Sequence, residues 1–183
     1  MIKTKILTGV ALLLFICCKE EVDTTYLITN QSVGKLDKIS LLRDIDIIYA
    51  QDSVVKDTTI INLSNNAKKV RIYEKGGKHL LTLTPSSDSI PTFENVKIED
   101  TRFVTEKGIS LKSTFKDIKD KYAIRKIITS MNNIVILLKD SDMYFTIDKK
   151  ELPSSLQYGS SKNIEAVQIP DQAKIKYFMV GWN

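Results

Sequence analysis

Cysteine and histidine are nearly absent from this chain of 183 residues, which has two cysteines and one histidine. Cys17 and Cys18 are adjacent, so they do not form the disulfide framework of a small secreted domain. His79 is the single imidazole, which excludes a zinc site built from cysteine and histidine. Only four prolines and seven glycines are present, which excludes collagen-like chains and chains made mostly of linkers.

Residue patterns that carry catalysis are also missing. No sequence signature gives His79 a nucleophile or an orienting carboxylate, so we expect it on a strand surface or half-buried. Asp44 and Asp46 are two residues apart and would point to different sides of a helix. Gly76-Gly77 lacks the strand-to-helix context of a phosphate-binding loop and reads as a hairpin turn. We therefore predict a protein that is not an enzyme, with no catalytic residue, no metal site and no cofactor.

The residues that are present favour a folded domain. Hydrophobic residues make up 43% of the chain, enough for the core of one ordinary domain or two very small ones. Basic residues number 27 against 22 acidic ones, but they are scattered among apolar residues. A nucleic-acid partner is therefore not expected, because such proteins gather their basic residues on one face.

The N-terminus has the pattern of an export signal. Lys3 and Lys5 precede the apolar run Ile6–Ile16. Eleven residues form about 16 Å of helix, roughly half the thickness of a bilayer core, so a signal peptide is favoured over a membrane span or a buried helix. We assign residues 1–18 to this signal.

The end of the run, Leu14-Phe15-Ile16-Cys17-Cys18, resembles a bacterial lipoprotein signal. The resemblance implies that Cys18 becomes the first residue of the mature protein and carries the lipid. The alternative is an ordinary signal peptide that leaves no lipid. Removal of the residues before Cys18 takes Lys3 and Lys5 away and lowers the formal net charge from +5 to +3.

The next residues, Lys19, Glu20 and Glu21, resemble the export signal of surface lipoproteins in the Bacteroidota. The resemblance implies an outer-membrane protein, anchored by lipid and exposed on the cell surface, with a periplasmic-facing location as the alternative. The competing interpretation of the three charges is a solvated linker. Residues 19–25 form a short polar linker in either case.

The rest of the chain contains two related halves. Ser40–Tyr49 aligns with Ser113–Tyr122 at an offset of 73, and a second pair of segments aligns at an offset of 64. Apolar residues in the first pair have helical spacing, so each predicts a short helix. Thr114, followed by Asp117, suits the start of the second helix. The segments of the second pair predict two β-hairpins, which turn at Gly76-Gly77 and at Asp140-Ser141.

Further strands are predicted over 93–98, 101–105, 164–169 and 174–182, with a hairpin turn at 170–172. We therefore expect an α+β fold of two tandem helix-plus-β-hairpin repeats, with a mostly antiparallel sheet and short helices on one face. Residues 26–98 would form the first repeat and residues 99–183 the second, with the C-terminal strands.

One stretch of the second half carries a family resemblance: Gly108-Ile109, Leu111, Ser113-Thr114-Phe115, Asp117-Ile118 and Tyr122, followed by a hairpin. It is similar to tandem small-repeat folds such as β-lactamase-inhibitor-protein-like domains and the BamE (SmpA) outer-membrane-assembly lipoproteins. The resemblance implies a protein-binding function. Neither family has catalytic residues to transfer.

A short pattern, Asp followed by Ser or Thr, recurs four times. It is similar to the O-glycosylation sequon of Bacteroidota envelope proteins, which implies glycans on Thr24, Ser53, Thr58 and Ser89. The alternative is that these are ordinary turn residues in loops.

Three aromatic residues near the C-terminus, Tyr177, Phe178 and Trp182, are candidates for an exposed patch that binds a partner or a sugar. The alternative is that they complete the core of the domain. Together these observations predict a non-catalytic cell-envelope lipoprotein that binds an unidentified envelope protein and is attached to the membrane through its N-terminal lipid. The alternatives are an inhibitor or immunity-type protein directed against an envelope hydrolase, and a glycan-binding surface lipoprotein.

Overall fold

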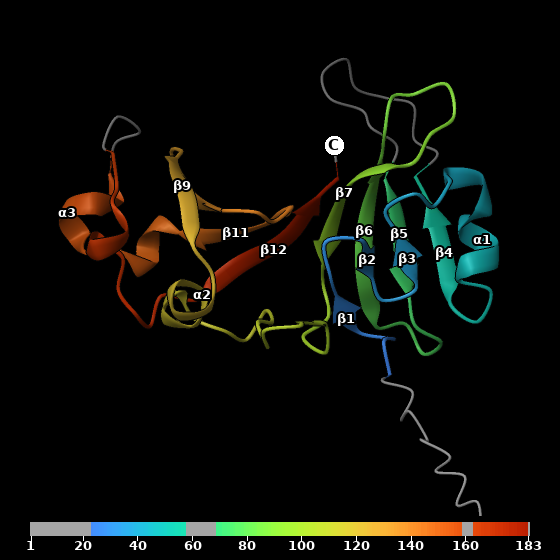
Figure 1. Ribbon diagram of the computed structural model, residues 1–183, viewed down its shortest axis with the longest axis horizontal. Coiled ribbons are helices and arrows are strands. Elements are labelled where there is room, and N and C mark those ends of the chain that lie inside the picture. Colours follow the sequence, from blue (N-terminus) through green and yellow to red (C-terminus); the bar gives the residue numbers. More distant parts are fainter. Residues whose placement is uncertain (1–22, 58–68, 159–162, 183) are drawn as a thin grey trace, which may run out of the picture.

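The computed structural model describes residues 23–57, 69–158 and 163–182, which are mostly β-structure (Figure 1). Its main feature is a sheet of eight antiparallel strands. In spatial order these are β4 (Ser53–Lys56), β5 (Val70–Tyr73), β6 (His79–Pro85), β7 (Phe93–Ile98), β12 (Ile175–Gly181), β11 (Met143–Asp148), β10 (Asn133–Leu138) and β9 (Ile124–Thr129). The last strand of the chain therefore lies in the middle of the sheet.

Each half of the sheet is a four-stranded meander in which neighbours in sequence are neighbours in space. A short helical segment precedes each meander: the 3₁₀ turn η1 (Leu42–Asp44) with α1 (Ile45–Ile48), and the helix α2 (Phe115–Lys121). The two meanders meet where β7 pairs with β12. This pairing makes one continuous sheet from the two halves.

A second, small sheet joins the start of the described chain to the connection between the halves. It consists of β3 (Leu36–Asp37), β2 (Ser32–Val33), β1 (Leu27–Ile28) and β8 (Val104–Thr105), and β1 runs parallel to β8. Gly34 turns the chain between β2 and β3 with φ of 57°. A Cβ at this position would lie 2.4 Å from the Thr25 carbonyl oxygen, so only glycine fits.

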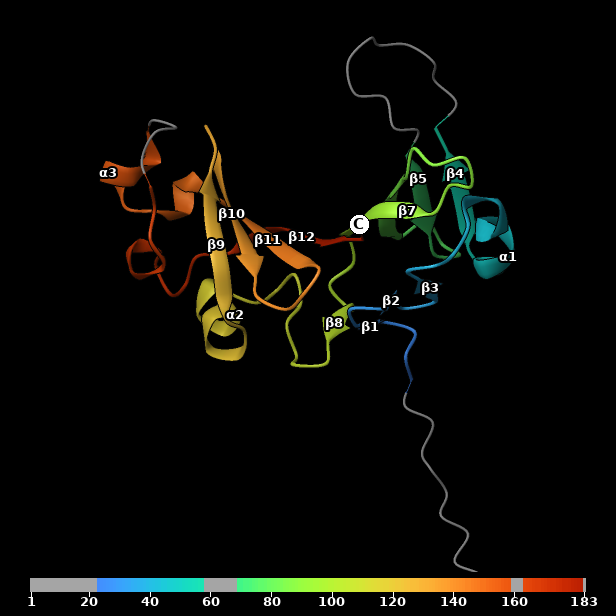
Figure 2. The same cartoon turned by 45° about the horizontal axis from the view of Figure 1, so that its top comes forward.

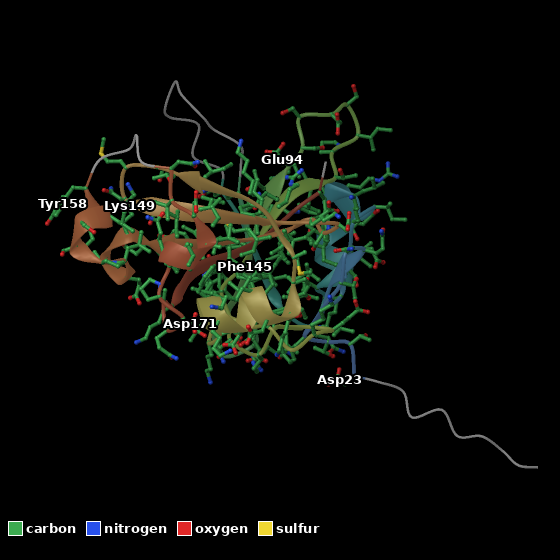
Figure 3. All side chains as sticks on the ribbon, turned by 60° about the vertical axis from the view of Figure 1, so that its left-hand side comes forward. Asp23, Glu94, Phe145, Lys149, Tyr158 and Asp171 are labelled. Atoms are coloured by element: carbon green, nitrogen blue, oxygen red, sulfur yellow. The ribbon has the colours of Figure 1, made fainter. Side chains whose placement is uncertain are left out.

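The hydrophobic core lies between the large sheet and the elements on one of its faces. Figure 2 shows α2 and the small sheet on the same side of the large sheet, and Figure 3 shows Phe145 in the interior. Phe115 and Ile118 are the buried residues of α2. Phe145 and Phe178 pack together on neighbouring strands with ring centroids 4.6 Å apart. One face of the large sheet is thus covered.

The connection after β11 forms three short helical segments: η2 (Lys149–Glu151), α3 (Ser154–Gln157) and η3 (Ala166–Gln168). The predicted strand over 164–169 is wrong, because η3 lies there. The chain does turn at 170–172, where the Ala173 N–H donates to the Pro170 carbonyl oxygen at 3.0 Å, but this turn does not join two paired strands. The backbone of residues 171 and 173 instead accepts hydrogen bonds from the start of α2. This pairing holds the segment beside the helix.

The predicted fold class is also wrong. The described residues are 39% strand and 17% helix, with sheets of four and eight strands, and they do not form two helix-plus-hairpin repeats. Each half contributes four strands to the large sheet because β4 and β9 follow the helices directly. Strand β4, between α1 and β5, is not among the strands that the sequence predicts.

A buried ion-pair network fixes the link between the halves. The Asp100 side chain is fully buried and accepts hydrogen bonds from the Arg102 backbone N–H at 2.9 Å and from the Arg102 Nε at 2.9 Å. Lys78 Nζ lies 3.0 Å from the same carboxylate. Arg102 also donates to both oxygens of Glu74, and it lies over the Tyr26 ring. This network ties the β5–β6 turn to the N-terminal segment.

Candidate functional site

The face of the large sheet opposite α2 is a candidate interaction surface, because it crosses all eight strands. One register row crosses all eight strands on this face: Val55, Arg71, Thr82, Lys97, Met179, Tyr144, Leu137 and Lys126. None of the eight residues is buried. We call this row, with its neighbours Asn95, Glu99, Val135 and Tyr177, the open face.

The adjacent register row has the opposite character. It contains Val54, Ile72, Leu81, Ile98, Phe178, Phe145, Ile136 and Ile127. The six residues on the inner strands are at most 1% exposed, and the two on the edge strands are partly buried. Because side chains alternate between the faces of a strand, the two rows separate the core from the open face.

The centre of the open face holds a chain of polar contacts. Thr82 Oγ1 donates to Glu99 Oε1 at 2.9 Å, and Lys97 Nζ donates to the same oxygen at 2.8 Å. Lys97 Nζ also lies 4.7 Å from the centroid of the Tyr177 ring. These contacts order side chains from three neighbouring strands, β6, β7 and β12.

His79 belongs to this network as a donor. Its ring stacks on Tyr73 with centroids 4.6 Å apart, and its Nε2 lies 3.1 Å from both the Leu81 carbonyl oxygen and Thr82 Oγ1. Because a carbonyl oxygen only accepts, Nε2 carries the proton. A protonated Nε2 cannot accept a proton from the Thr82 hydroxyl, so His79 does not act as a general base toward Thr82. Among the described residues, no group of three or more His, Cys, Asp or Glu side chains could hold a metal ion.

Tyr144 lies across the middle of the sheet. Asn95 Nδ2 donates to its hydroxyl, and its ring lies over Gly181, where a Cβ would come within 3.3 Å of Tyr144 Cε1. Beside it opens a cleft of about 890 Å³, lined by Arg125, Lys139, Asp140, Asp142 and Tyr144 among others. We call this the Tyr144 cleft.

A second cleft, of about 520 Å³, lies where β11 runs into η2, and we call it the Lys149 cleft. Lys176 is the extra residue of a β-bulge in β12, between Ile175 and Tyr177. Its Nζ donates to Asp148 Oδ2 at 2.8 Å and to Asn133 Oδ1 at 3.0 Å. The hydrogen bond from Lys176 and one from the Lys150 backbone lower the pKa of Asp148.

The structure separates the three aromatic residues predicted to form one patch. Tyr177 is 36% exposed and lies on the open face, whereas Phe178 is fully buried and Trp182 is 4% exposed. Phe178 points to the core because it neighbours Tyr177 on the same strand. The Trp182 backbone N–H donates to the Glu94 carbonyl oxygen, which extends the β12–β7 pairing. The prediction of a three-residue aromatic patch is therefore wrong, because only Tyr177 is exposed.

The other predicted site residues fall into two groups. Cys18, Lys19, Glu20, Glu21 and Thr58 lie outside the described residues. Thr24 and Ser89 are exposed and lie outside regular strands. Ser53 is exposed but begins the edge strand β4, so the loop expected there is wrong.

Sequence reasoning did not identify Lys97, Tyr144 or Lys176 as surface residues. The signal for the first two was available, because each alternates with apolar residues that are buried in β7 and β11. Lys176 gave no such signal, since a bulge shifts the alternation by one residue.

Comparisons with known proteins find a fold likeness. No known protein family matches the chain, and no curated protein matches its sequence. The chain is similar in structure to the uncharacterized protein yfeY from Escherichia coli, with a TM-score of 0.55 and 12% sequence identity over 83% of this chain and 97% of that one. At this identity the likeness concerns the fold alone.

Proposed function

We propose that this chain is a non-catalytic, lipid-anchored protein of the cell envelope that binds another envelope protein through the open face. The observation that carries the proposal is the register row from Val55 to Lys126, which crosses eight strands without a buried residue. It contains Arg71, Met179 and Tyr144, which belong to the residue types enriched at protein interfaces.

The size of the open face fits a protein partner. Eight strands span roughly 34 Å, because neighbouring strands lie about 4.8 Å apart. A six-residue strand adds roughly 20 Å in the other direction, which gives roughly 700 Å². A typical stable interface buries about 800 Å² on each partner.

The position of the N-terminus supports an anchor on the opposite side. Asp23 lies close to the small sheet, at the covered side of the large sheet (Figure 3). Four residues lie between Cys18 and Asp23, so the two Cα atoms are at most about 18 Å apart. A lipid on Cys18 would therefore hold the covered side near the membrane and direct the open face away from it. Among the described residues, no helix is long and apolar enough to span a membrane.

The lipid anchor is tested by mass spectrometry of the N-terminal peptide in wild type and in Cys18→Ala. We expect a diacylglycerol-modified Cys18 in the membrane fraction, and loss of that modification in the variant. Protease treatment of intact cells then separates surface exposure, our expectation, from the periplasmic-facing alternative. An unmodified N-terminus in wild type would remove the anchor from the proposal.

The open face is tested by placing a photo-crosslinking amino acid at Leu137 or Met179 in intact cells, with Lys112 as the matched exposed position on the other side. We expect the same single adduct from both open-face positions and none from Lys112. The charge reversal Lys97→Glu should abolish the adduct. Equal adducts from all three positions, or none, would contradict the proposal.

The Tyr144 cleft favours a second candidate function, glycan binding. It combines the Tyr144 ring with carboxylates of Asp140 and Asp142 and with Arg125, the residue types that stack on sugars and bond to their hydroxyls. Calorimetric titration with envelope polysaccharide fragments tests this candidate. Binding that Tyr144→Ala abolishes would support it over a protein partner.

A further inference from the structure

Strand β9 ends the large sheet, and among the described residues it pairs only with β10. The Ser130 N–H donates to the carbonyl oxygen of Asn133, the residue opposite it, at 2.9 Å. Bonded and non-bonded residue pairs alternate along antiparallel strands, so Ile128 belongs to a bonded pair, whereas Ile127 and Thr129 belong to non-bonded pairs. The N–H and C=O groups of Ile127 and Thr129 therefore point away from β10, towards the open edge of the sheet.

Basic side chains lie along this edge. Arg125, Lys126 and Lys139 are exposed, and none of them forms an ion pair with another described residue. The adjoining Tyr144 cleft contains two acids, but one of them, Asp142, is paired with Lys38 at 2.8 Å. Within the described part of the chain, one unpaired carboxylate therefore faces three unpaired bases.

The side chains of β9 suit an extended peptide. Lys126 and Ile128 lie on the open face, and Ile128 is 41% exposed. Arg125 is the extra residue of a bulge and lines the Tyr144 cleft on the same face. A strand paired with β9 would place alternate side chains beside these three residues, at about 5 Å. Acidic side chains in those positions would contact Arg125 and Lys126, and an apolar one would cover Ile128.

We propose that β9 binds an extended, acidic segment of the partner protein, which pairs with it as a ninth strand of the large sheet. Main-chain hydrogen bonds to Ile127 and Thr129 would hold the segment, as in other complexes formed by strand addition. Its carboxylates would form charge-assisted hydrogen bonds with Arg125 and Lys126. The inference rests on the proposed function, because it specifies how the protein at the open face is held.

The opposite edge of the sheet, β4, provides an internal comparison. Lys56 of β4 is paired with Asp46 of α1, which lies beside this strand (Figure 1). Arg71 of the next strand is paired with Asp57 at 2.9 Å. The bases at this edge are therefore neutralised within the fold, unlike those at β9. A second copy of the chain is a poorer occupant of β9 than an acidic segment, because it would add its own unpaired bases to the same edge.

The test is an NMR titration of the purified protein carrying Cys18→Ser with a short capped peptide in which glutamate alternates with valine. We expect saturable shifts of the Ile127 and Thr129 amides. A peptide with lysine in place of glutamate should bind about fivefold more weakly or worse. The acidic peptide with all backbone nitrogens methylated should not bind, because it has no N–H groups to donate.

Four outcomes of this titration would overturn the proposal. The first is the absence of a saturable shift at Ile127 and Thr129. Equal binding of the methylated peptide would show attraction by charge alone, and equal binding of the lysine peptide would exclude an acidic partner. Shifts of the same amides that depend on protein concentration, without peptide, would identify a second copy of the chain as the occupant.

Variants of the two edges separate strand pairing from loss of structure. Thr129→Pro removes an outward N–H but no bond to β10, and it should weaken the acidic peptide by about fivefold. Lys56→Pro is the matched control: its N–H also points outward, because the neighbouring Asp57 N–H bonds to the Lys69 carbonyl oxygen. Lys126→Glu, a surface change, should weaken binding without affecting the fold. Wild-type affinity in Thr129→Pro and Lys126→Glu, or equal weakening by Lys56→Pro, would contradict the assignment.

Photo-crosslinking in cells separates this inference from the proposed function. We expect Thr129→Pro and Lys126→Glu to reduce the adduct formed at Leu137. An undiminished adduct in both variants would contradict the role of β9 and leave the open face as the partner site. Absence of any adduct in the parent protein, with the acidic peptide still bound at β9, would contradict the open face and leave β9 as the binding site.

Discussion

At the scale of single residues, Asp100 illustrates how burial and hydrogen bonding oppose each other. Burial raises the pKa of this carboxyl, but hydrogen bonds from Arg102 and Lys78 lower it more, so its pKa is about 2. The unfolded chain has an ordinary carboxyl pKa near 4. Because the folded pKa is the lower one, Asp100 stabilises the fold above pH 4, and this contribution is lost as the pH falls towards 2.

We therefore predict that the free energy of unfolding falls by about 2 kcal/mol between pH 5 and pH 2 through Asp100 alone. Urea unfolding at a series of pH values measures it. In Asp100→Asn the stability should be lower at pH 7 and should change less with pH. Asp88→Asn, in the exposed β6–β7 loop, should reproduce the wild-type profile. Identical pH profiles for wild type and Asp100→Asn would refute the prediction.

Tyr177 and Phe178 are neighbours in sequence, but Tyr177 lies on the open face and Phe178 lies in the core. Phe178→Ala should lower the stability by about 3–5 kcal/mol, because it leaves a cavity beside Phe145. Tyr177→Ala should cost less than about 1.5 kcal/mol, because this ring is partly exposed. Chemical unfolding measures both. If the two variants lost the same stability, the assignment of the two faces of β12 would be wrong.

At the scale of secondary-structure elements, the helix α2 starts where the sequence predicts. Asp117 accepts a hydrogen bond from the Thr114 backbone N–H at 2.7 Å, and this contact, opposed by partial burial, lowers the pKa of Asp117. The local pattern is sufficient here because the cap and its partner are three residues apart.

Replacement of Asp117 by Ala should therefore lower the stability by about 1 kcal/mol, through loss of the helix cap. Asp120→Ala removes an exposed ion pair with Lys116 and should cost less than about 0.5 kcal/mol. Thermal unfolding of the two single variants measures their loss of stability. Equal losses in the two variants would argue against a cap at Asp117.

Local patterns also predicted both central hairpins. Gly76 and Gly77 turn the chain between β5 and β6 with φ of 110° and 89°, and Asp140 has φ of 56° between β10 and β11. Strands β4 and β9 were missed because edge strands bury less, and their apolar pattern is weak. The order of strands depends on contacts between distant segments, which single-sequence patterns do not contain.

The open face was only partly predictable for the same reason. Alternation along β7 or β11 indicates an exposed side for each strand. The row that joins Lys97 to Met179 exists only because β7 pairs with β12, and these strands are far apart in the sequence. The Lys149 cleft depends on a bulge, and no residue pattern predicted it.

At the scale of the whole molecule, β12 connects the two meanders. It pairs with β7 on one side and with β11 on the other, and it supplies Phe178 and Val180 to the core. Truncation before Ile175 should therefore prevent folding of both halves, and not only of the half that contains β12.

Circular dichroism and hydrogen exchange of this truncated chain measure the effect. We expect loss of cooperative unfolding and no protected amides in β6, β7 and β11. Ser89→Ala, in the exposed β6–β7 loop, serves as the control and should leave protection unchanged. Protected amides in β5 and β6 of the truncated chain would show that the first meander folds alone.

The central position of the C-terminal strand also determines when the molecule completes its fold. A ribosome adds about 5–20 residues per second, so roughly 4–15 s pass between synthesis of β7 and of β12. During this interval neither β7 nor β11 has its second neighbour, and the large sheet has no centre. The export that we propose for this chain requires it to stay unfolded until it has crossed a membrane. A large sheet that cannot close before its last strand is made is compatible with that requirement.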